Sequence, residues 1–75
     1  MNVDRADNCF HEVALQGCDD KVRVTRIRES WDGGPALRIQ IRQAGGRVLF
    51  GPEIPLTALP GVMAAMTELL IEGSQ

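Results

Sequence analysis

Apolar and polar residues alternate along the middle of this 75-residue chain with the period of two that is typical of β-strands. The segment 36–43 shows this pattern most regularly. Its inward positions are Leu37, Ile39 and Ile41, and its outward positions are Arg38, Gln40 and Arg42. Residues 10–16 predict an earlier strand, with Val13 and Leu15 directed inward and Glu12 outward. The sheet is therefore expected to have one apolar and one polar face.

The strand predicted over residues 21–31 departs once from that period. Val22 and Val24 mark one face, but the next apolar residue, Ile27, is three positions further along the chain. A β-bulge at residues 25–26 would restore the alternation. With such a bulge the outer face carries Arg23, Arg26 and Arg28.

Glycine-rich and polar segments predict the turns that separate four strands. The predicted turns cover residues 17–20, 32–35 and 44–46. A fourth strand begins at Arg47, is interrupted at Gly51 and Pro52, and continues to residue 56. Because proline donates no hydrogen bond to a ladder, this segment is expected at the edge of the sheet or sharply bent.

After residue 56 the apolar residues recur at steps of three and four, which is typical of an amphipathic helix. These positions are Leu59, Val62, Met63, Met66, Leu69 and Leu70. Thr57 is the candidate N-cap, and Gly73 is a suitable C-terminal end. We therefore predict an α+β fold, in which a four-stranded antiparallel curved sheet is covered on its apolar face by one helix. Residues 9–73 form this domain, and residues 1–8 form a flexible N-terminus.

The small size of the chain predicts self-association. A domain of this length buries only about 60% of the surface that its unfolded chain exposes, so it needs further stabilisation. Two cysteines do not make a disulfide framework. Cys9, His11 and Cys18 supply at most three metal ligands, so no structural metal is expected. A homodimer is expected, with its interface at Met63, Met66 and Leu70.

Sequence features exclude several other classes of protein. The N-terminus shows no basic start followed by an apolar run, so we expect no signal peptide. No apolar stretch approaches the roughly 18 residues of a membrane span, so a cytoplasmic protein is expected. His11 has no nucleophile in a recognisable setting, and the carboxylates are not paired. The paired glycines lie in predicted hairpins and do not open a helix. We expect no catalysis and no cofactor.

Basic residues are concentrated in the middle of the chain. Residues 21–50 carry a formal charge of +5, whereas residues 1–20 carry −4 and residues 51–75 carry −3. The basic residues of this window are Lys21, Arg23, Arg26, Arg28, Arg38, Arg42 and Arg47. Arginines that share one face of a sheet form a candidate platform for single-stranded DNA or RNA, and backbone phosphates would make its affinity fall steeply with salt.

Two segments resemble known families. The stretch Lys-Val-Arg-Val-Thr-Arg-Ile-Arg-Glu-Ser-Trp at 21–31 is similar to the arginine-rich strand of the positive cofactor four family of transcriptional coactivators. Ile-Pro-Leu-Thr at 54–57, followed by one helix, resembles that family's last strand and helix, and the order of elements also resembles a PUR repeat (Whirly-like). The resemblance implies a dimeric single-stranded nucleic-acid-binding protein with a role in transcription regulation. Carried over by position, it implies a binding face formed by Arg23, Arg26, Arg28, Arg38, Arg42 and Arg47.

The supply of aromatic residues distinguishes nucleic-acid binding from the alternative function, protein–protein interaction. Sheets that bind nucleic acid usually present aromatic side chains for base stacking, and this chain has Phe10, Trp31 and Phe50. Phe50 is a candidate core residue, so Trp31 is the aromatic expected at the binding face. The alternative is a small homodimeric protein-interaction module without nucleic-acid binding. The nucleic-acid interpretation requires guanidinium groups that emerge together, opposite the helix and not neutralised one by one by carboxylates.

Overall fold

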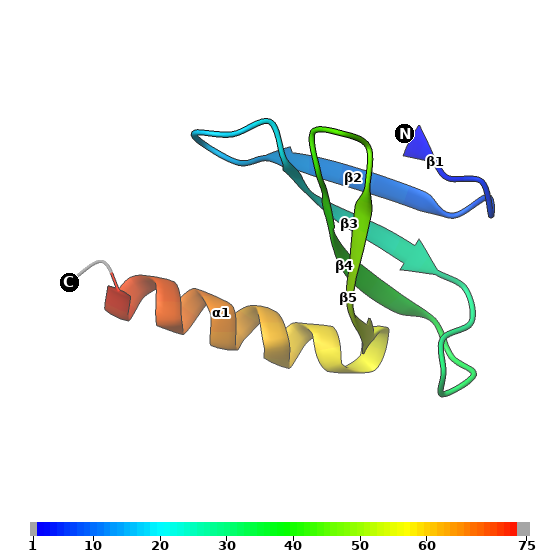
Figure 1. Ribbon diagram of the computed structural model, residues 1–75. Coiled ribbons are helices and arrows are strands. Elements are labelled where there is room, and N and C mark those ends of the chain that lie inside the picture. The colour runs from blue at the N-terminus through cyan, green and yellow to red at the C-terminus, as the bar shows by residue number, and fades with distance from the viewer. Residues whose placement is uncertain (1, 74–75) are drawn as a thin grey trace.

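The computed structural model describes residues 2–73 as an open antiparallel sheet followed by a helix (Figure 1). The strands are β1 (Asn2–Val3), β2 (Cys9–Ala14), β3 (Lys21–Ile27), β4 (Ala36–Arg42) and β5 (Val48–Pro55), followed by the 3₁₀ helix η1 (Leu56–Ala58) and α1 (Leu59–Gly73). Each strand pairs with the next, in the order β1-β2-β3-β4-β5. The antiparallel sheet with one C-terminal helix agrees with the prediction. The sheet has five strands instead of four, because residues 2–3 pair with β2.

The pairing register gives the sheet two chemically different faces. Residues opposite one another on neighbouring strands lie on the same face. The polar face carries Phe10, Glu12, Lys21, Arg23, Thr25, Arg38, Gln40, Arg42, Val48, Phe50 and Glu53. The aliphatic face carries Val13, Val22, Val24, Leu37, Ile39, Ile41, Leu49 and Ile54, together with Cys9, His11 and Arg26.

The predicted bulge in β3 is wrong. β3 pairs with β4 without interruption from Lys21 opposite Arg42 to Ile27 opposite Ala36. Ile27 therefore lies on the face opposite to Val24, and it is buried there against Ala36. The apolar positions shift by one residue between Val24 and Ile27 because the side chain of Ile27 is buried on the other face of the strand, and not because a residue is inserted. Arg26 consequently lies on the aliphatic face, where its side chain is exposed.

The bulge lies instead in the edge strand β5. Its register changes between Arg38, which is opposite Glu53, and Gln40, which is opposite Phe50, so β5 contains one extra residue. A Cβ atom at Gly51 would overlap the backbone oxygen of Ile39, so only glycine permits this close approach. The predicted interruption of the fourth strand is thus a bulge within one continuous strand.

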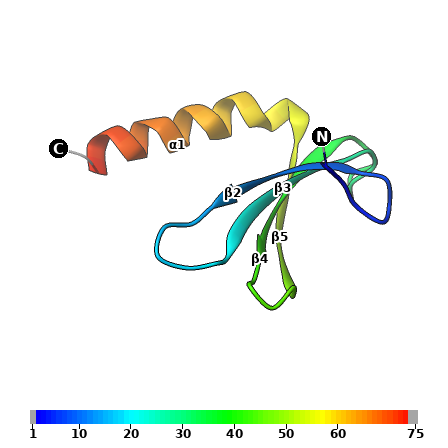
Figure 2. The same ribbon diagram turned by 90° about the horizontal axis from the view of Figure 1, so that it is seen from above.

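The helix does not cover the sheet, which contradicts the prediction. None of the residues Leu59–Gly73 is buried, and the only element that α1 contacts extensively is η1. Figures 1 and 2 show α1 leading away from the end of β5. Thr57 is not the N-cap, because it lies within η1, which has no side-chain cap. The root of the helix is held instead by Leu56 N–H, which donates a hydrogen bond to Pro35 O at 3.1 Å.

The hydropathy of the C-terminal segment bears on the expectation that no membrane span is present. Leu56–Gly73, at a mean hydropathy of 1.2 over 18 residues, is long and apolar enough to cross a membrane by length and composition. Core helices of soluble proteins pass the same test, so the finding is weak evidence.

Candidate functional site

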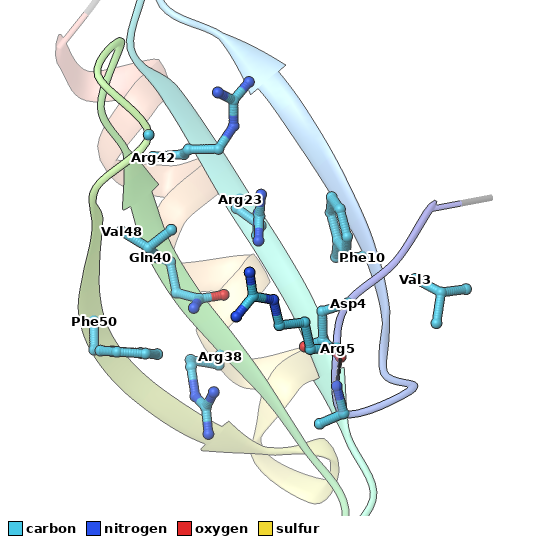
Figure 3. Close-up of a pocket in the computed structure, with 12 residues that line it drawn as sticks. Val3, Asp4, Arg5, Phe10, Arg23, Arg38, Gln40, Arg42, Val48 and Phe50 are labelled. Atoms are coloured by element: carbon cyan, nitrogen blue, oxygen red, sulfur yellow. Dashed lines mark hydrogen bonds between the residues drawn. The ribbon is translucent and has the colours of Figure 1, made fainter.

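The polar face is hollowed into a groove of about 590 Å³ (Figure 3). Its floor is formed by β3 and β4, and one wall is formed by Val48 and Phe50 of β5. The opposite wall includes Phe10 of β2 and the N-terminal segment 3–6, from which Arg5 extends over the groove. We call this hollow the polar groove.

Three predicted arginines meet at this groove. Arg23 lies opposite Gln40, whereas Arg38 and Arg42 are the two neighbours of Gln40 on the same face of β4. Uninterrupted alternation in β3 and β4 directs all three side chains to the polar face. Lys21, opposite Arg42, lies on the same face at the end of β3.

Glu12, on β2, holds two of these arginines. Its carboxylate accepts hydrogen bonds from Arg42 Nε at 2.6 Å, from Arg42 Nη2 at 3.1 Å and from Arg23 Nε at 2.9 Å. The hydrogen bonds with Arg42, assisted by those with Arg23, lower the pKa of Glu12 from 4.5 to about 2, against the opposing effect of partial burial. The same pairing raises the pKa of Arg42. The three groups therefore form a charged cluster at neutral pH.

Glu53, on β5, holds the third arginine. It accepts hydrogen bonds from Arg38 Nε at 3.0 Å and Arg38 Nη2 at 2.8 Å, and a further one from the hydroxyl of Ser30. The Ser30 hydrogen bond, followed by that of Arg38, holds the pKa of Glu53 below its usual value. Both Arg38 nitrogens donate to Glu53 Oε2, whereas Ser30 donates to Oε1, and these contacts fix the Arg38 guanidinium on the groove.

Carboxylates largely balance the positive charge of the groove. Its arginines are Arg5, Arg23, Arg38 and Arg42, and the carboxylates beside them are Asp4, Glu12 and Glu53. The guanidinium groups thus emerge together, but three of them are paired with carboxylates, which counts against a simple charged platform. Arg23, Arg38 and Arg42 use Nε and Nη2 in these pairs, so Nη1 of each arginine makes no ion pair within residues 2–73.

Two phenylalanines stand beside the paired arginines. The Arg23 guanidinium carbon lies 4.0 Å from the Phe10 ring centroid, and that of Arg38 lies 5.3 Å from the Phe50 centroid. Phe50 is 73% exposed, so its assignment to the core is wrong. Sequence reasoning missed Phe10 and Phe50 as groove residues, although Phe10 alternates in phase with Glu12. It also missed Arg5, because that residue lies in an acidic segment.

The floor of the groove contains a buried polar pair. Thr25 is 1% exposed and Gln40 is 6% exposed. The Thr25 hydroxyl donates a hydrogen bond to Gln40 Oε1 at 2.6 Å. The pair joins β3 to β4 beneath the arginines and leaves the amide nitrogen of Gln40 as a further donor.

The remaining candidate residues lie elsewhere. Arg26 is on the aliphatic face, and Arg28 lies beyond β3, with Nη2 at 3.7 Å from Asp7 Oδ2. Trp31 is 81% exposed in the β3–β4 loop and does not line the groove. Arg47 is exposed in the turn between β4 and β5, at the other end of the sheet. The structure therefore divides the predicted binding residues between the groove, with Lys21 on the same face beside it, and three other places: the aliphatic face, the loop between β3 and β4, and the turn between β4 and β5.

Metal-ligating and nucleophilic residues form no comparable site. Within residues 2–73, no group of three or more His, Cys, Asp and Glu side chains is arranged to hold a metal ion. Cys9 and Cys18 are exposed free thiols, and His11 lies on the aliphatic face. The polar groove is therefore the candidate functional site.

Comparison with known proteins found no matching family model, no similar curated protein and no similar solved structure. The resemblance to positive cofactor four and PUR repeats consequently stays a prediction.

Proposed function

We propose that the polar groove binds single-stranded nucleic acid, either DNA or RNA, without catalysis and without a cofactor. The observation that carries the proposal is the pair of arginine–phenylalanine contacts, Arg23 with Phe10 and Arg38 with Phe50, on one hollowed face of the sheet. Phe50 and the guanidinium planes offer flat surfaces on which unpaired bases stack.

Stacking would supply more of the affinity than charge. Each base stacked on an aromatic side chain contributes about 1–3 kcal/mol. Of the cations on the polar face, only Arg5 and Lys21 have no carboxylate partner within residues 2–73. A single strand that meets two free cations gives a salt slope of about −1.4, at about −0.7 for each phosphate. The steep salt dependence expected from sequence is therefore replaced by a shallow one.

Fluorescence anisotropy tests the proposal with labelled single-stranded DNA and RNA at low salt. Wild-type protein is expected to bind both, and unlabelled duplex to compete poorly because its bases are already stacked. Phe50→Ala is expected to weaken binding about 5-fold to 150-fold, the equivalent of one stacked base. Absence of binding at tens of micromolar protein, or binding unchanged by Arg23→Glu combined with Arg38→Glu, contradicts the proposal. Since Phe50 is exposed, its replacement leaves the fold intact.

A second candidate function is a protein-interaction module that does not bind nucleic acid. The observation that favours it is the exposure of α1 and of the aliphatic face, described below. A pull-down whose partners survive nuclease treatment would support this second function, whereas loss of all partners on nuclease treatment would support the first.

A further inference from the structure

Two apolar surfaces are left uncovered by the rest of residues 2–73. One is the aliphatic face of the sheet, where Val13 is 60% exposed. The other is α1, whose exposed apolar side chains include Met63, Met66, Leu69 and Leu70. A soluble monomer rarely leaves contiguous apolar surfaces of this size open to water. Their exposure therefore needs a partner.

The isolated chain lacks a hydrophobic core. Within residues 2–73 the only buried apolar residues are Ile27 and Ala36, fewer than the three buried polar residues. A compact monomer of 8.2 kDa exposes about 4,500 Å², whereas this chain exposes 5696 Å². Its radius of gyration is 13.7 Å, compared with about 11 Å for a compact chain of this length. So little burial does not offset the conformational entropy lost on folding.

The geometry indicates where a partner fits. Seen from the polar face, α1 lies behind the sheet, on the same side as the aliphatic face (Figure 3). Its root is fixed by the hydrogen bond from Leu56 N–H to Pro35 O, but the helix makes no extensive contact with any strand. A second copy related by a two-fold axis can place its helix on this sheet and receive this helix on its own sheet. One association then covers all four surfaces.

Area and apolar character favour a second copy over another partner. The carboxylates of α1, Glu68 and Glu72, lie on the side of the helix opposite Met63, Met66 and Leu70. They therefore stay in water when that apolar stripe packs on an aliphatic face, which is the kind of surface that each copy exposes. The excess exposed area is about 1,200 Å² for each chain, which exceeds the roughly 800 Å² that each partner buries in a standard interface.

We propose that two copies of this chain form a helix-exchanged homodimer, in which α1 of each copy packs on the aliphatic face of the other. The arrangement uses Met63, Met66 and Leu70, the interface residues expected from the sequence, and packs each helix on a sheet. It is independent of what the polar groove binds, since the groove is on the opposite face.

Light scattering after gel filtration tests the stoichiometry. The expected mass is about 16 kDa, twice the 8.2 kDa of one chain. Leu70→Glu is expected to shift the mass toward one chain and to reduce helicity, whereas Phe50→Glu, the same replacement on the polar face, leaves the dimer intact. A wild-type mass of one chain at 100 µM overturns the proposal. So does co-sedimentation with lipid vesicles in place of self-association.

Cross-linking tests the exchange itself. Cys9 lies on the aliphatic face beside His11. One chain keeps Cys9 but carries Cys18→Ser. Its partner carries Cys9→Ser, Cys18→Ser and a single helix cysteine, from Met63→Cys, Met66→Cys or Leu70→Cys in turn. On oxidation at least one mixture is expected to give a covalent heterodimer. A third chain keeps Cys9, carries Cys18→Ser and adds the same helix cysteine. If no mixture gives the heterodimer and this third chain bridges only within itself, α1 folds back on its own sheet and exchange is wrong. Failure here leaves oligonucleotide binding untouched, and failure of binding leaves the dimer untouched.

Discussion

The hydroxyl of Thr25 donates a hydrogen bond to Gln40 Oε1 at 2.6 Å, and both side chains are buried beneath the polar groove. A buried polar group that loses its partner costs about 1–3 kcal/mol. Thr25→Val is therefore expected to lower the free energy of unfolding, measured with urea, by about that amount. Thr57→Val, at an exposed threonine of η1, should change stability by less than about 0.5 kcal/mol. The double variant Thr25→Val with Gln40→Leu should recover most of the loss, and a double variant weaker than Thr25→Val alone would contradict the pairing.

The bulge in β5 predicts intolerance of any side chain at residue 51. Gly51→Ala places Cβ against the Ile39 carbonyl oxygen, so the strand must shift. We expect a loss of about 1–3 kcal/mol in urea unfolding, which is typical of overpacking. Gly45→Ala is the matched control, because a Cβ atom there meets open space. Equal stability of the two variants would contradict the close approach.

Acidification should weaken the fold through Glu12. The folded pKa, about 2, lies below the ordinary value of 4.5, so the carboxylate stabilises the folded state fully above pH 4.5. That stabilisation is lost as the pH falls from 4.5 to 2. In Glu12→Gln this contribution is absent. The difference in urea midpoint between wild type and variant should be constant above pH 5 and should shrink toward pH 2, and a difference that does not vary with pH would count against the cluster.

Base stacking at the groove predicts different effects for two exposed aromatic residues. Phe50→Ala removes a side chain beside Arg38, whereas Trp31→Ala removes one that lies outside the groove. Anisotropy titrations should show weaker oligonucleotide binding for Phe50→Ala and unchanged binding for Trp31→Ala. The reverse order would move the binding surface to the β3–β4 loop.

Burial of the aliphatic face in the helix-exchanged dimer predicts that a charge placed on that face opposes association. Val13→Glu places a carboxylate on an exposed position of the face that receives the apolar side of the partner helix. The dissociation constant of the dimer, measured by sedimentation, should therefore rise several-fold. Arg28→Glu, at a residue beyond β3, is the control that should have little effect. Equal dissociation constants for the two variants would argue against contact between the helix and this face.

The sequence predicted the strands well and their faces less well. Alternation in residues 36–42 was sufficient to place β4 correctly, because every inward position is a large aliphatic residue. The three-residue spacing between Val24 and Ile27 was ambiguous, since a bulge and a change of the buried face both produce this spacing of apolar residues. Only pairing with Ala36 decides between them. Arg26 was consequently assigned to the wrong face.

Contacts between strands that are distant in sequence explain what else was missed. Glu12 is 30 residues from Arg42, and no local pattern predicts that one carboxylate holds two arginines. The spacing of apolar residues in α1 correctly predicted a helix with an apolar side. That spacing shows that the apolar side needs a surface to pack on, but it does not show whether the same chain or a second copy supplies this surface.

The two outer strands of the sheet limit how copies can join. At one rim β5 carries Pro52 within its bulge, and at the other rim β1 covers part of β2 and leaves only residues 11–14 unpaired, so neither rim offers a long straight row of free amides and carbonyls. Continuation of the ladder from molecule to molecule, as in a fibril, is thereby discouraged even though the sheet is not closed. Growth by edges is disfavoured, and an assembly built through the faces stops at a finite number of chains.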